Sequence, residues 1–206
     1  MKNTIRKLKH SAIASLLLLV LAVPFLVERK MKMEETAQYV LVAQQYLNIV
    51  LPLCVAVLFF CCFYEKTQGK GRELFYLADR GCGKELFFIY TVVAGSLGLS
   101  VLLFYHSHIA QPGIFFLQYL ILEYSLLSFC YALLYVTSHI VVVLLGVLLF
   151  YGMLLTGAGG TGTLFLYPWE QAVTIRALCY AMRYELLLGA FSNLIGIFAN
   201  KKYTSY

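Results

Sequence analysis

Runs of apolar residues long enough to cross a lipid bilayer dominate this sequence and restrict what it can fold into. A membrane-spanning helix needs about 20 predominantly apolar residues. Runs of this kind lie near residues 11–27, 46–64, 86–105, 114–136, 139–156 and 184–199. Because a segment inside a bilayer must satisfy its own backbone hydrogen bonds, the sequence predicts an all-α, polytopic membrane protein with about six transmembrane helices in a single domain, 1–206.

The last of these runs leaves an alternative open. It is the shortest run, and the polar residues Ser192 and Asn193 interrupt it. A chain with five spans, or with a re-entrant last segment, is therefore also compatible with the sequence. In either arrangement the connections are short, and we expect no separate catalytic domain.

Charged residues are few and gather at the ends of the apolar runs. They make up 13% of the chain, whereas soluble domains carry roughly 25%. The net charge of +6 is therefore interpreted as a membrane-topology signal and not as a nucleic-acid-binding surface. Both termini are predicted to be cytoplasmic, in a multi-pass protein of a cell membrane such as the bacterial plasma membrane. This orientation places most basic residues inside: Lys2, Arg6, Lys7, Lys9, Lys66, Lys70, Arg72, Arg80, Lys84, Lys201 and Lys202.

Three connections are long enough to carry further information. Two are predicted to be outside the cell, from Glu28 to Gln45 and from Gly157 to Arg183, and one is cytoplasmic, from Glu65 to Glu85. In the cytoplasmic one, Leu74, Leu77 and Ala78 recur at helical spacing and predict a short helix with one apolar face. A purely solvated connector is the alternative, but it has little reason to expose such apolar side chains to water.

The residues of this cytoplasmic connection resemble the permease subunit of type-2 ATP-binding-cassette transporters. In that family a coupling helix joins the second and third spans and docks into a cytoplasmic ATPase subunit. Glu65 matches the acidic residue at the end of the second span, and Lys84 matches the basic residue before the third. The resemblance implies that the ATPase contact is formed by Glu65, Gly71, Arg72, Glu73, Leu74, Phe75, Tyr76 and Leu77.

The same resemblance implies an assembly and a function. Two permease chains, the same or related, would combine with two ATPase chains in the membrane lipid, and ATP binding would open a path for export between the two permease chains. The 15 Phe and 16 Tyr suit amphipathic cargo such as peptides, drugs or lipids. The basic N-terminal segment is shorter than the connecting helix of that family, and the chain is smaller than many of its members.

Nucleotide binding is expected on the partner and not on this chain. Residues 78–85 nearly match a phosphate-binding loop, but Ala78 replaces the first glycine and Glu85 follows the lysine, where Ser or Thr would hold magnesium. ATP and Mg²⁺ are therefore assigned to the ATPase subunit. We expect this chain to hold no cofactor or metal and to have no enzyme activity of its own.

Glu123 is the candidate intramembrane site, because it lies near the middle of the fourth predicted span. An ionised carboxylate is costly there unless it faces protein or water. It is interpreted as a structural interhelical hydrogen-bonding group, with Tyr119 or a tyrosine of another span as its partner. A polar contact on a substrate path and a proton-linked group are the functional alternatives.

Other functional classes are weaker alternatives. A secondary carrier predicts several intramembrane charges or broken helices, and a non-transporting scaffold subunit has no positive signal. An intramembrane protease with the paired Glu34 and Glu35 needs an Arg four residues later, where Tyr39 stands. A Cys–His membrane peptidase needs a His close to Cys82, and its connection contains none.

Overall fold

The computed structural model describes residues 2–33, 39–68, 83–156 and 174–204. Every regular element in these ranges is helical, which confirms the predicted all-α class. The elements are α1 (Lys2–Leu17), the π-helical η1 (Leu18–Ala22), α2 (Val23–Met33), α3 (Tyr39–Gln68), α5 (Gly83–Ser100), the π-helical η2 (Val101–Tyr105), α6 (Pro112–Thr137), α7 (Ile140–Thr156), α8 (Ile175–Ala181) and α9 (Arg183–Thr204).

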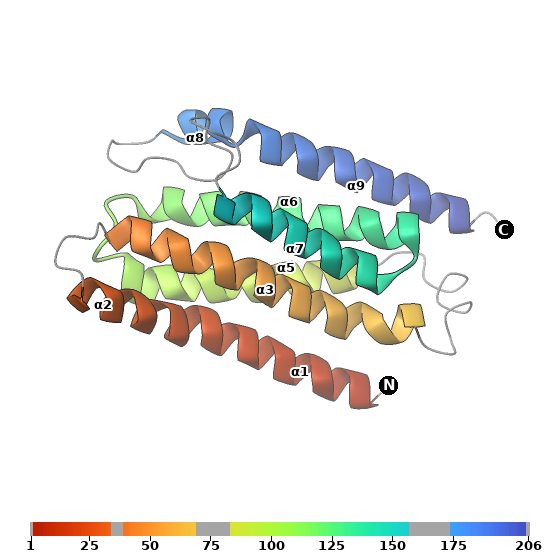
Figure 1. Ribbon diagram of the computed structural model, residues 1–206, viewed down its shortest axis with the longest axis horizontal. Helices are drawn as coiled ribbons and strands as arrows, with labels where there is room; N and C mark the ends of the chain where they lie inside the picture. Colours follow the sequence, from red (N-terminus) through yellow and green to blue (C-terminus); the bar gives the residue numbers. More distant parts are fainter. Residues whose placement is uncertain (1, 34–38, 69–82, 157–173, 205–206) are drawn as a thin grey trace.

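The long helices lie side by side along one axis of the molecule (Figure 1). α1, η1 and α2 form one continuous rod at one edge, and α9 lies at the opposite edge. α3, α5, α6 and α7 fill the space between them. The start of α1 and the end of α9 lie at the same end of the bundle.

Four helices in the described part of the chain are long and apolar enough to cross a membrane. They cover His10–Lys32, Val42–Tyr64, Glu85–Tyr105 and Pro112–Thr137. These four extend the first four predicted spans by a few residues at one or both ends. The fifth predicted span coincides with α7, whose described apolar part is the shorter Ile140–Leu149, and the sixth lies in α9.

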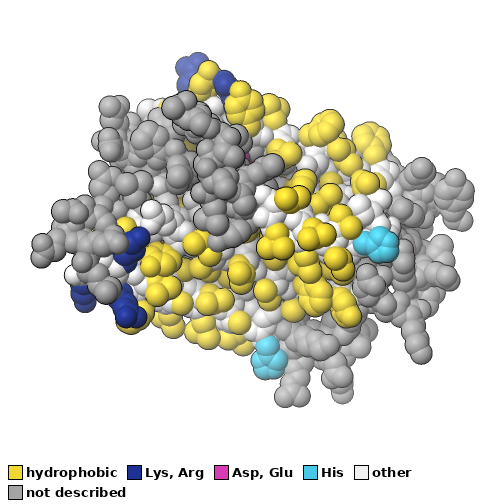
Figure 2. Space-filling model, in the orientation of Figure 1, with side chains coloured by type: hydrophobic (Ala, Val, Ile, Leu, Met, Phe, Trp, Pro, Cys, Tyr) yellow, Lys and Arg dark blue, Asp and Glu magenta, His cyan; other side chains and the backbone are white. Residues whose placement is uncertain are grey.

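The outer surface of the bundle is apolar, as a bilayer requires. Phe87, Leu102 and Leu149 each expose about 70% of their surface, and hydrophobic side chains cover much of the described face in Figure 2. A soluble protein rarely exposes contiguous apolar surface of this extent. The chain is therefore a membrane protein, with its lipid-compatible side chains outside and its polar side chains partly inside.

α9 packs closely along α6 through two glycines. A Cβ atom at Gly196 would overlap the ring of Tyr131, and one at Gly189 would lie 2.8 Å from Cε1 of Tyr124 and 3.1 Å from Cα of Ser125. The contacts advance by seven residues in the same direction on both helices, so α6 and α9 run parallel. Small residues permit this approach where lipid supplies no hydrophobic driving force. Ser192 is buried between Gly189 and Gly196 in sequence, and α9 continues through it without a break.

Candidate functional site within the membrane

The predicted coupling segment lies outside the described residues, as do Gly71, Arg72, Glu73, Leu74, Phe75, Tyr76 and Leu77. Glu65 belongs to the last turns of α3, but its side chain is also outside the described set. The end of α3 and the start of α5, which flank this segment, lie at the end of the bundle that also carries the start of α1 (Figure 1). Glu34, Glu35 and Cys82 fall outside the described residues as well.

Glu123 is fully buried in the middle of α6. It follows Phe115 and Tyr119 at intervals of four residues, so the three side chains share one face of the helix. Neither carboxylate oxygen has a hydrogen-bond partner in the described part of the chain. The hydrogen bond to Tyr119 considered from the sequence is therefore not formed.

Tyr119 bonds to a different helix. Its hydroxyl donates to Oδ1 of Asn48 on α3 over 3.2 Å, and both side chains are buried. Pro52 lies four residues after Asn48 in α3 and has no N–H to offer the Asn48 carbonyl. The ring of Phe115 lies edge-on between Tyr119 and Tyr105, with centroid separations of 5.1 and 5.8 Å. This polar and aromatic layer connects α3, η2 and α6 inside the apolar bundle.

The Tyr119–Asn48 bond gives a direct stability test. Tyr119→Phe is expected to lower the free energy of unfolding by about 1 kcal/mol, because it leaves the buried Asn48 amide without its donor. Side-chain hydrogen bonds between membrane helices contribute about 0.6 kcal/mol on average, so the coupling between Tyr119→Phe and Asn48→Leu should be of that size. Thermal unfolding of the two single variants and the double variant in detergent measures it. Strictly additive effects would show that the bond contributes nothing.

An aromatic cavity of about 190 Å³ lies between α5, α6 and α9. Its lining combines three tyrosines with two smaller polar side chains and three apolar ones: Tyr90, Tyr124, Tyr131, Ser128, Asn193, Leu86, Phe87 and Leu127. Tyr124 and Tyr131 are the rings that pack on Gly189 and Gly196, so the close approach of α9 positions this wall. Tyr90 also lies within electrostatic range of Glu123.

The structure adds two buried polar groups that the sequence analysis did not single out. Glu185 in the first turn of α9 is 1% exposed, and Gln44 in α3 is fully buried. Neither side chain has a hydrogen-bond partner among the residues that the structure describes. In the sequence both lie at the ends of apolar runs, where polar residues normally face the membrane boundary. Only the packing of α9 and α3 against their neighbours buries them.

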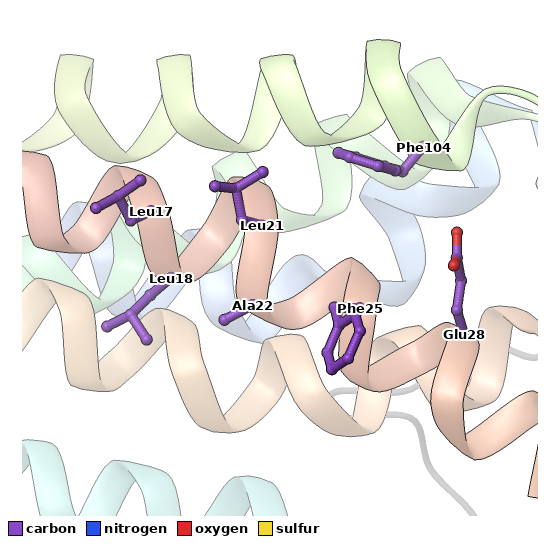
Figure 3. A pocket seen from close by; sticks show the side chains of 7 residues that line it. All are labelled: Leu17, Leu18, Leu21, Ala22, Phe25, Glu28 and Phe104. Atoms are coloured by element: carbon purple, nitrogen blue, oxygen red, sulfur yellow. The ribbon is translucent and has the colours of Figure 1, made fainter.

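A larger cavity, of about 620 Å³, is an open groove between the α1–α2 rod and η2. Its lining is apolar apart from one carboxylate and comprises Leu17, Leu18, Leu21, Ala22, Phe25, Glu28 and Phe104 (Figure 3). Cavities of this volume are in the range of about 300–1,000 Å³ that small-molecule sites occupy. The groove and the aromatic cavity are thus two places in the described chain where open space meets polar side chains, and Glu123 and Glu185 line neither of them.

Among the described residues, the buried carboxylates form neither a metal-binding cluster nor a hydrogen-bonded pair. In the described ranges, no group of three His, Cys, Asp or Glu side chains is placed to hold a metal ion. Glu123 and Glu185 each lack a hydrogen-bonded base or nucleophile in the same part of the chain, although catalytic pairs need one within hydrogen-bonding reach.

Comparison with protein-family models, with curated proteins and with solved structures finds no match for this chain.

Proposed function

We propose that this chain is the membrane-spanning permease subunit of an ATP-binding-cassette transporter and that it exports amphipathic substrates. The observation that carries the proposal is the gathering of three parts of the chain at one end of the bundle (Figure 1). These are the start of α1, the end of α9, and the pair formed by the end of α3 and the start of α5, which flank residues 69–82. The segment with the Gly-Arg-Glu-Leu sequence is thereby attached to two membrane-length helices.

The proposed topology has six crossings. Four crossings are the four apolar helices. α7 and α9 are the proposed fifth and sixth crossings, since each runs along the bundle in the direction that its place in the chain requires (Figure 1). Both termini and residues 69–82 are assigned to the cytoplasmic side of a bacterial plasma membrane. ATP and Mg²⁺ bind to two partner ATPase chains, and a second permease chain, the same or related, completes the pathway.

α5 connects the proposed ATPase contact to the interior of the bundle. It begins at Gly83, directly after the segment, and its first two turns carry Leu86, Phe87 and Tyr90 into the aromatic cavity. A displacement of the segment would therefore move one wall of that cavity relative to α6 and α9. ATP can shift the transporter from one orientation to the other only to the extent that ATP binds one orientation more tightly than the other.

Co-purification with candidate cytoplasmic ATPases tests the proposal. Leu74→Asp and Leu77→Asp are each expected to abolish retention of the ATPase, since each puts a carboxylate into an apolar contact. His106→Asp is the matched control, because it introduces the same side chain at an exposed position of the turn between η2 and α6, at the opposite end of the bundle. The control should retain the ATPase as the wild type does.

Two results would reject the coupling assignment. One is retention of the ATPase by both leucine variants while they express and insert normally. The other is the absence of any ATPase that the wild-type chain retains. Equal loss in His106→Asp would instead attribute the effect to general damage and not to the segment.

A secondary carrier is the second candidate, and the two buried carboxylates favour it. Glu123 and Glu185 lie on α6 and α9, and both are buried without a hydrogen-bond partner among the described residues. Intramembrane carboxylates commonly mark ion and proton pathways. Substrate movement driven by an ion gradient in vesicles that contain this chain and no ATPase would select this candidate.

A further inference from the structure

The outer side of α8 and α9 is a continuous strip of exposed side chains. The side that faces the bundle is marked by buried residues at helical spacing: Leu178, Met182, Glu185, Gly189, Ser192 and Gly196. This series continues through the junction between the two helices, so the side opposite it is continuous as well. α9 lies at the edge of the bundle, and the opposite side therefore faces outward (Figure 1).

Most of this strip is apolar or aromatic. Its residues recur every three or four positions, and each exposes more than half of its surface: Tyr184, Leu187, Phe191, Leu194 and Phe198. Between residues 184 and 198 a helix rises about 21 Å, whereas one leaflet of bilayer hydrocarbon is about 15 Å thick. Because the chain is a membrane protein, lipid covers this outward side, and the strip is long enough for a whole acyl chain.

Two exposed arginines, Arg176 and Arg183, stand where the strip begins. Tyr180 and Tyr184 are exposed beside them. Figure 2 shows basic side chains next to hydrophobic ones over α8 and the start of α9, at the end of the bundle away from both termini. Tyrosine is typical of the boundary between membrane and water. The basic end of the strip is therefore expected at the level of the lipid head groups.

Arg183 is held in place by the two tyrosines. Its Cζ lies 4.5 Å from the ring centroid of Tyr180 and 4.8 Å from that of Tyr184. Its Nη2 donates to the hydroxyl of Tyr184 over 3.0 Å. A guanidinium group has several N–H donors, so this bond leaves others for an acceptor from outside the chain. An arginine that is already oriented loses less conformational entropy when it binds such an acceptor.

No exposed carboxylate offsets these positive charges on α8 or α9. The acidic residue of these two helices is Glu185, which is 1% exposed and lies on the side that faces the bundle. Its carboxylate oxygens have no hydrogen-bond partner among the described residues, so neither arginine is bonded to it. Glu170, the preceding acidic residue in the chain, lies outside the described residues. The outward side is thus positively charged beside α8 and apolar below it.

We propose that this side of α8 and α9 binds an anionic phospholipid. The guanidinium of Arg183 meets the phosphate, because its planar fork of donors matches phosphate oxygens, and Arg176 adds a second positive charge. The acyl chains lie along the strip from Leu187 to Phe198. A zwitterionic lipid carries its own positive group to the same place and binds less tightly. The proposal requires only that this side of α9 faces lipid, so it is independent of the ATPase contact.

Native mass spectrometry of the full chain in a neutral detergent tests the proposal, with phosphatidylglycerol and phosphatidylcholine of identical acyl chains as probes. The wild type is expected to retain phosphatidylglycerol and to prefer it by about tenfold. Arg183→Gln should weaken phosphatidylglycerol about fivefold, the effect of one exposed ion pair, and should weaken phosphatidylcholine less. The double variant of Arg176→Gln and Arg183→Gln should show no preference between the two lipids.

Arg29→Gln is the matched control, since it removes an exposed arginine at the same end of the bundle but on α2, at the opposite edge. It should bind both lipids as the wild type does. Equal retention of the two lipids by the wild type overturns the proposal, as does equal weakening of phosphatidylglycerol by Arg29→Gln and Arg183→Gln. Displacement of the lipid by inorganic phosphate overturns it too, as does a dimer whose second copy covers the strip with no lipid bound. Binding is measured without any ATPase, so its failure is distinct from failure of the ATPase contact.

Discussion

Gly196→Leu is expected to separate α9 from α6 and to lower the free energy of unfolding by about 3 kcal/mol, at the upper end of the usual cost of overpacking. Even a Cβ atom at this position would overlap the ring of Tyr131. That ring is itself packed edge-on against Tyr135, with centroids 4.9 Å apart, so it cannot move freely along α6. The larger leucine side chain must therefore push the helices apart.

Thermal unfolding in detergent measures this effect, with a thiol-reactive fluorophore that reports exposure of the buried Cys54 and Cys130. Gly95→Leu is the control, because a Cβ atom at Gly95 meets no atom within 4 Å and the position faces outward from α5. The control should be as stable as the wild type or slightly more stable, since leucine has the higher helix propensity. Equal stability of the two variants would contradict the close α6–α9 packing.

Glu123→Leu is expected to raise the free energy of unfolding, by about 2 kcal/mol, because it removes a buried polar group that no hydrogen bond compensates. The carboxyl group is fully buried and has no partner among the described residues. A group that reduces stability in this way has no structural role as a hydrogen-bonding link between helices. A stabilised Glu123→Leu variant would therefore favour a role on the substrate or proton path over the structural interpretation.

The same unfolding assay decides between the two interpretations. Glu28→Leu serves as the comparison, since it removes an exposed carboxylate and should change stability by less than about 0.5 kcal/mol. Destabilisation of Glu123→Leu by more than that amount would show that the carboxyl group has a partner in the folded protein. The structural interpretation would then be restored.

Agreement between sequence and structure is greatest for the long helices. The limits predicted for the first four spans lie within a few residues of the observed helices, because bilayer-spanning length and apolar composition are properties of the local sequence. α9 was harder to interpret, since Ser192 and Asn193 read as interruptions of an apolar run. The helix is continuous, and Ser192 is buried between the two glycines that pack on α6. The ATPase contact around Arg72 stays a prediction, because it falls outside the described residues.

The sequence by itself determined that this is an all-helical membrane protein, because a long apolar run must form a helix in lipid whatever it packs against. Only the tertiary structure decided where the polar groups lie. The direction of the Tyr119 hydroxyl toward Asn48 and the burial of Glu185 depend on which helix faces which, and helical periodicity does not contain that information. The groove depends on it as well, since its two walls are joined by residues 81 positions apart in the chain.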